Sequence, residues 1–143
     1  MSKKILAFAL VLCMVFSLAP MSVMAQEGTA FTDVAETDFF YEPVLWAVEE
    51  GITNGIGNNE FDPYGLCNRA HIVTFLWRAN GSTAPTTTES PFVDVVNVDG
   101  AFYYNAVLWA VENGITNGMT ADHFGLENVC NRAQMVTFMA RAD

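Results

Sequence analysis

The chain has 143 residues, of which 52% are hydrophobic and 15% charged, and its 6 basic and 16 acidic residues give a net charge of −10. This length suits one or two small domains, and the apolar content can bury a core, which excludes a disordered chain. Because so few cations cannot form a basic patch, the composition also argues against nucleic-acid binding.

The first 25 residues have the layout of a secretory signal peptide. Two lysines precede an apolar run over Ile5–Leu18, and the small residue Ala25 ends the segment. A membrane-spanning helix needs about 20 apolar residues, whereas Pro20 interrupts this run early. We therefore expect a secreted protein that is cleaved after Ala25 and no longer contacts the membrane. The cleaved chain would keep four arginines, no lysine and all 16 acidic residues, a net charge of −12.

The chain beyond the signal segment contains the same unit twice. Phe31–Val34 recurs as Phe92–Val95, and the segment VLWAVEEGITNG at 44–55 recurs as VLWAVENGITNG at 107–118. From residue 44 onward the offset between the copies is constant at 63 residues. We expect a first repeat over 29–80, a Ser/Thr/Pro linker over 81–90 and a second repeat over 91–143.

Each repeat predicts two helices joined by a glycine-rich loop. The first helix is expected over about 41–50, where apolar residues recur at helical spacing, and the second from about 69 to 79. Phe61 and Phe124 are expected to anchor the two loops in the core. The fold class is therefore all-α, with tandem helix-loop-helix repeats, each led by a short extended segment. Such a helix pair is too small to bury its own apolar face, so the repeats must stack.

The start of the second helix carries the candidate binding residues. Asn68 and Asn131 are good N-cap residues. Gln134 can complete a capping box with Asn131, whereas His71 fits that pattern less well.

Arg69 and Arg132 fall on the first helical position, at the positive end of the helix dipole, although the chain has acids to spare. Two interpretations are open. Each guanidinium and the free N–H groups of the helix could bind a carboxylate or phosphate, or each arginine could pair with an aspartate such as Asp33 or Asp94. Arg78 and Arg141, at the other end of the helix, favour a structural role.

No catalytic, metal or cofactor site emerges from the sequence. The two histidines, His71 and His123, occupy non-equivalent positions and lack a nucleophile at a useful spacing. The segment 97–100 resembles a calcium loop but lacks the glutamate that would complete it. Cys67 and Cys130 can form a disulfide, or each can make a separate apolar contact. Trp77 is a candidate platform for stacking a sugar. We expect a protein that is not an enzyme.

The order of these motifs resembles the S-layer homology (SLH) domain. Phe-x-Asp-Val, Trp-Ala-Val-Glu-x-Gly-Ile-Thr-Asn-Gly, Phe-x-Pro and Asn-Arg-Ala follow one another, and the match runs over 31–79 and 92–142. The resemblance implies non-covalent attachment to the cell wall of a Gram-positive-type bacterium. Its ligand would be a secondary cell-wall polymer linked to peptidoglycan, often with a pyruvate ketal. The family's arginine, here Arg69 and Arg132, contacts that acid group beside the capping residues Asn68 and Asn131. The family's groove glycines map to Gly51, Gly55, Gly114 and Gly118.

The sequence departs from the family pattern in two respects. The motif's threonine is replaced by asparagine in both repeats, and its glutamate by His71 and Gln134. The family usually works as three repeats, whereas this chain carries two, so a third repeat from another chain is one way to complete the unit. The alternative function is a structural one, in which the module pairs with other SLH repeats and has no glycan ligand of its own.

Overall fold

A computed structural model describes residues 31–143, and the expected signal segment lies outside this range. The all-α expectation is confirmed. The helices are α2 (Tyr41–Glu49), α3 (Arg69–Ala79), α4 (Tyr104–Glu112) and α5 (Arg132–Ala142). Within the described range the only β-type pairings are two isolated bridges, Gly57 with Glu60 and Asn68 with Val129. The local helix signals therefore give the helix positions to within about one residue.

The first helix of each repeat ends in a glycine stop. The N–H of Gly51 donates to the carbonyl of Val48 at 3.0 Å, and the N–H of Ile52 donates to that of Ala47 at 2.8 Å. These two bonds form a Schellman motif, which satisfies carbonyls that the helix leaves free. The same pair of bonds recurs 63 residues later at the end of α4.

The second helix of each repeat starts with a capping box. Asn131 and Gln134 form the expected reciprocal bonds at the start of α5. At the start of α3 the side chain of Asn68 accepts from the N–H of His71 at 2.9 Å, and the N–H of Asn68 donates to His71 Nδ1 at 3.4 Å. His71 thus completes a capping box, because its ring nitrogen accepts a hydrogen bond as a glutamate oxygen would. Its bond is longer than the 3.1 Å bond that Gln134 accepts, which agrees with the expectation that His71 fits less well.

The aspartate of each Phe-x-Asp-Val segment ties the start of the repeat to its loop. Asp33 accepts from the N–H groups of Phe61 at 2.9 Å and Asp62 at 2.7 Å. Asp94 accepts from three successive N–H groups that begin at Phe124. Phe124 is fully buried, as expected, whereas Phe61 is half-buried.

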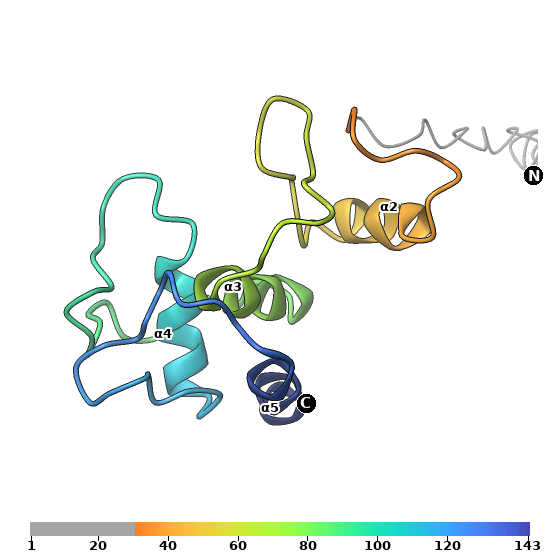
Figure 1. Cartoon of the computed structure of the whole chain (residues 1–143). Helices are drawn as coiled ribbons and strands as arrows, with labels where there is room; N and C mark the ends of the chain where they lie inside the picture. The colour runs from red at the N-terminus through yellow and green to blue at the C-terminus, as the bar shows by residue number, and fades with distance from the viewer. Residues whose placement is uncertain (1–30) are drawn as a thin grey trace, which may run out of the picture.

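The main core lies between the two repeats. α3 of the first repeat packs on α4 and α5 of the second, while α2 lies apart from these three helices (Figure 1). Ala70 and Val73 of α3 meet Ala106, Val107 and Ala110 of α4 in one buried cluster. The apolar face of α3 is therefore buried by the neighbouring repeat.

The linker is held against this core. The indole N–H of Trp77 donates to the carbonyl of Thr83 at 2.8 Å, and the carboxylate of Glu112 accepts from the N–H groups of Thr86 and Thr87. These N–H groups lower the pKa of Glu112. Trp77 packs against the core and has its polar atom in use, so it is not the exposed platform that the sequence indicated.

Candidate functional site between the repeats

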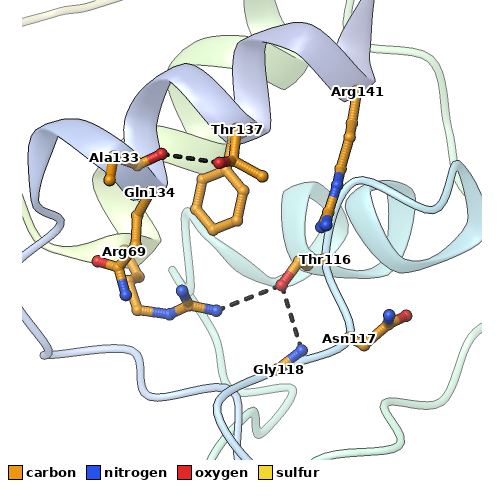
Figure 2. A pocket seen from close by; sticks show the side chains of 9 residues that line it. Arg69, Thr116, Asn117, Gly118, Ala133, Gln134, Thr137 and Arg141 are labelled. Carbon is orange, nitrogen blue, oxygen red and sulfur yellow. Dashed lines mark hydrogen bonds between the residues drawn. The ribbon is translucent and has the colours of Figure 1, made fainter.

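A cavity of about 400 Å³ lies where α3 meets the second repeat (Figure 2). It is lined by Arg69 of α3, by the turn after α4 and by one face of α5. The lining residues are Arg69, Thr116, Asn117, Gly118, Ala133, Gln134, Thr137, Phe138 and Arg141. Two of the four arginines of the described chain therefore meet here, and no lining residue carries a carboxylate.

Arg69 is fixed by contacts to the second repeat. Its side chain is only 3% exposed. Nε donates to the carbonyl of Phe124 at 2.9 Å, and Nη2 donates to Thr116 Oγ1 at 3.2 Å. The guanidinium carbon lies 4.7 Å from the ring centroid of Phe124 and 5.1 Å from that of Phe138, within the range of cation–π attraction.

No carboxylate pairs with Arg69 in the part of the chain that the structure describes. The one ion pair over residues 31–143 joins His123 to Asp122. Burial alone would raise the pKa of Asp94, but the hydrogen bonds that it accepts from backbone N–H groups outweigh this effect and lower its pKa. The carboxylate of Asp94 therefore binds the loop of its own repeat and does not pair with Arg69. The salt-bridge interpretation of Arg69 is therefore wrong for this range.

Arg69 keeps its charge and one free face. Burial lowers its pKa, and Asp94 and Cys130 partly offset this effect, but the ordinary arginine pKa is so high that the group stays cationic at neutral pH. Nη1 makes no hydrogen bond within the described residues, where every buried side-chain polar atom has a partner. We infer that Nη1 is the atom open to the cavity.

The backbone N–H groups at the start of α3 are not free for an anion. The N–H of Arg69 donates to the carbonyl of Asn128 at 2.9 Å, and the N–H of Ala70 donates to the carbonyl of Leu126 at 3.3 Å. The segment 126–130 of the second repeat runs antiparallel to 67–70 and takes these donors. The expected contribution of free N–H groups is thus wrong for α3, and Arg69 alone provides the positive charge at this helix end.

The four candidate glycines fall into two pairs. Gly118 lines the cavity with φ +84°, and a Cβ there would lie 2.5 Å from the ring of Phe92 and under 3 Å from two backbone carbonyls. Gly55 has the same conformation and lines a second cavity. Gly51 and Gly114 line neither cavity and end helices instead.

Arg132 is placed differently from Arg69, although the sequence treats them as equivalent. Its side chain is exposed and has no partner among residues 31–143, because no further repeat within this range follows α5. Asn68 and Asn131 act as caps, and Asn68 also donates to Glu127 at 3.1 Å.

Sequence reasoning missed several residues that line the cavity. Gln134, Thr137 and Arg141 lie one turn apart on α5, a polar stripe that helical spacing could have identified. Arg141 also has the structural role expected of it, because Nη1 donates to the carbonyl of Ile115 at 3.0 Å. Thr116 and Asn117 belong to the repeated Gly-Ile-Thr-Asn-Gly turn, in which only the glycines were selected.

These features define a tandem-repeat helical module with a cationic, hydroxyl- and amide-lined cavity at the repeat interface. The sequence profile of the S-layer homology domain matches residues 30–72 and 91–136, so the chain belongs to this family. It is also similar to the Surface-layer 125 kDa protein of Lysinibacillus sphaericus, at 30% identity over 101 residues. The match covers 71% of this chain and 8% of that relative. The family and this relative support a role as a cell-surface anchoring module in general terms.

Two further properties concern the described residues alone. None of the helices in residues 31–143 has the length and apolar character needed to cross a bilayer. No group of three or more His, Cys, Asp or Glu side chains in the same range could hold a metal ion.

Proposed function

We propose that this secreted chain binds an acidic secondary cell-wall polysaccharide in the cavity between its repeats and catalyses no reaction. The observation that carries the proposal is the charge of the cavity, which has two arginines and no carboxylate in a strongly acidic chain. The negative charge elsewhere disfavours loose association with anionic polymers, which concentrates recognition at this point.

The cavity also suits a saccharide. Nη1 of Arg69 can donate to a carboxylate, and the side chains of Asn117, Gln134 and Thr137 can bond sugar hydroxyls. Among the lining residues there is no histidine, cysteine or carboxylate to serve as a general base. The partner we propose is the wall polymer linked to peptidoglycan of a Gram-positive-type bacterium, and the acid group is a pyruvate ketal.

The test adds one negative charge to the cavity without changing its shape. Gln134→Glu is nearly isosteric and keeps the capping box, in which glutamate is the commonest partner. Asn105→Asp is the matched control, because it adds the same charge at an exposed position on α4 outside this cavity.

Sedimentation with purified cell walls, before and after the wall polymer is stripped, measures the binding. The chain should sediment with intact walls only. The added carboxylate repels an acidic ligand in the same cavity, so Gln134→Glu should weaken binding. The Asn105→Asp control should bind as the unmodified chain does. Equal binding by Gln134→Glu would place the site elsewhere, and equal sedimentation with stripped walls would exclude the polymer as the ligand.

A competition experiment identifies the acid group. Soluble polymer that carries the pyruvate ketal should displace the chain from walls, and the same polymer without pyruvate should not. Equal displacement by both polymers would exclude pyruvate as the recognised group.

A further inference from the structure

We propose that this chain associates head to tail with a second copy of itself, with the α5 end of one copy docked on the α2 end of the next. The pattern for this contact is present within one chain, where α3 docks on α4 and on the loop of the second repeat. The association does not depend on what the cavity between the repeats binds.

The α5 end repeats the docking face of α3 but leaves it exposed. Val73 of α3 is fully buried, whereas its counterpart Val136 is 60% exposed. Met139, the counterpart of a partly buried leucine, is 50% exposed. Arg132 is exposed beside them. α5 therefore repeats the valine and the arginine of the α3 docking face and has methionine in place of Ile72 and Leu76, whereas Ala140 replaces Trp77.

The α2 end repeats most of the surface that receives α3, with Pro43 in place of the fully buried Ala106. Trp109 of α4 is 7% exposed, whereas its counterpart Trp46 of α2 is 55% exposed. Phe102 stacks on the ring of His71 at 5.6 Å, but its counterpart Phe39 is 89% exposed. In the docked pair Trp46 would cover α5, and Phe39 would lie on Gln134, the counterpart of His71.

The first repeat also holds the socket for an arginine. A cavity of about 520 Å³ there is lined by Thr53, Phe61 and Phe75. Their counterparts 63 residues later are Thr116, Phe124 and Phe138, the residues that fix Arg69.

The hydroxyl of Thr53 accepts one bond, from the N–H of Gly55 at 3.1 Å, which Thr116 repeats with Gly118 at 3.2 Å. Arg132 of a second copy would therefore donate to Thr53 and to the carbonyl of Phe61, as Arg69 does to their counterparts.

The backbone fits the same register. Within the chain the N–H of Arg69 donates to the carbonyl of Asn128, and the N–H of Cys130 donates to the carbonyl of Cys67 at 3.0 Å. The same pairing between copies joins the N–H of Arg132 to the carbonyl of Gly65 and sets Cys130 of one copy opposite Cys67 of the next. The N–H of Arg132 has no partner among residues 31–143 and is available for this bond.

Such an interface joins two different surfaces, so each copy keeps one free end and the assembly grows as a chain or closes as a ring. Each junction would build a further cavity around Arg132 with the chemistry of the one around Arg69. Only the use of that cavity as a glycan site rests on the proposed function.

The test blocks each end separately, without any saccharide present. Val136→Glu with Met139→Glu blocks the α5 end, and Phe39→Glu with Trp46→Glu blocks the α2 end. All four side chains are exposed, so the helices should persist in circular dichroism. Val98→Glu is the control, because Val98 is 54% exposed and outside both surfaces.

Sedimentation velocity should show concentration-dependent oligomers for the unmodified chain and for the control. Each blocked variant alone should associate at least about tenfold more weakly. A mixture of the two blocked variants should form a dimer, because one free end of each kind remains. A monomeric unmodified chain, or a mixture that stays monomeric, would overturn the proposal.

Cysteine cross-linking tests the register. In the chain that begins after Ala25, and so lacks Cys13, Cys67→Ser and Cys130→Ser variants each keep one thiol. Oxidation of their mixture should give a mixed disulfide dimer, and neither variant alone should cross-link. Dimers formed within one variant would show a contact between like surfaces and would overturn the head-to-tail register.

Discussion

Replacement of Arg69 and of Arg132 by methionine should have very different effects on stability. The two residues occupy the same position of the repeated motif. Arg69 is buried between two rings and donates to two oxygens of the second repeat, whereas Arg132 is exposed. Methionine retains the apolar stem of either side chain but removes the charge and the donors.

The magnitude for Arg69→Met follows from its contacts. Loss of a charged donor costs about 1.5–3 kcal/mol per bond, and the two cation–π contacts contribute about 1 kcal/mol each. Relief of the desolvation of a buried guanidinium, together with the packing of methionine, offsets several kcal/mol of this loss. We expect a net loss of about 2–3 kcal/mol, or about 10 °C in Tm. Arg132→Met should stay within about 0.5 kcal/mol.

Thermal unfolding followed by circular dichroism measures this difference. A low protein concentration keeps any contact between chains from adding to the stability of Arg132. Equal losses for the two variants would refute the assignment of Arg69 to the interface between repeats and of Arg132 to an open end.

Three further predictions concern the loop, the turn and the cysteines. The lowered pKa of Asp94 means that its stabilisation is present above its unfolded pKa of about 3.9 and is lost as the pH falls through the folded value; a pH series of Tm should fall below about pH 4, and less steeply for Asp94→Asn. Gly118→Ala should cost about 3 kcal/mol or more in chemical denaturation, because its Cβ meets a ring and two carbonyls, whereas Gly114→Ala, with open space around it, should cost about 1–2 kcal/mol. Oxidation of the single chain should join Cys67 to Cys130, which lie opposite each other, and closure of the 63-residue loop should stabilise by up to about 4 kcal/mol; intact mass and Tm with and without reductant check this.

The helices could be predicted from the sequence because their signals are local. Apolar spacing, the asparagine caps and the glycine stops act within a few residues, and these signals occur in both repeats. His71 was the exception within a cap, because a ring nitrogen replaced the usual carboxylate oxygen there. The motif position also located Arg69 at the start of a helix, which is where it lies.

The surroundings of Arg69 could not be predicted, because they come from residues far along the chain. Thr116 and Phe124 contact it across 47 and 55 residues of sequence. Helical periodicity shows that α3 has an apolar face, but it does not show which helix buries that face. The loss of free N–H donors at α3 has the same origin, since the strand-like pairing with 126–130 is also long-range.

Equivalent residues of the two repeats differ in exposure because the repeats have different neighbours. A repeat protein is stabilised by each unit and by the interfaces between neighbours. Within residues 31–143 there is one such interface, and the outer faces of α2 and α5 are exposed. Val73 and Val136 are the same residue in the same motif, yet one is buried and the other is exposed. In the head-to-tail association proposed above, α5 and α2 would make between chains the kind of contact that α3 and α4 make within one.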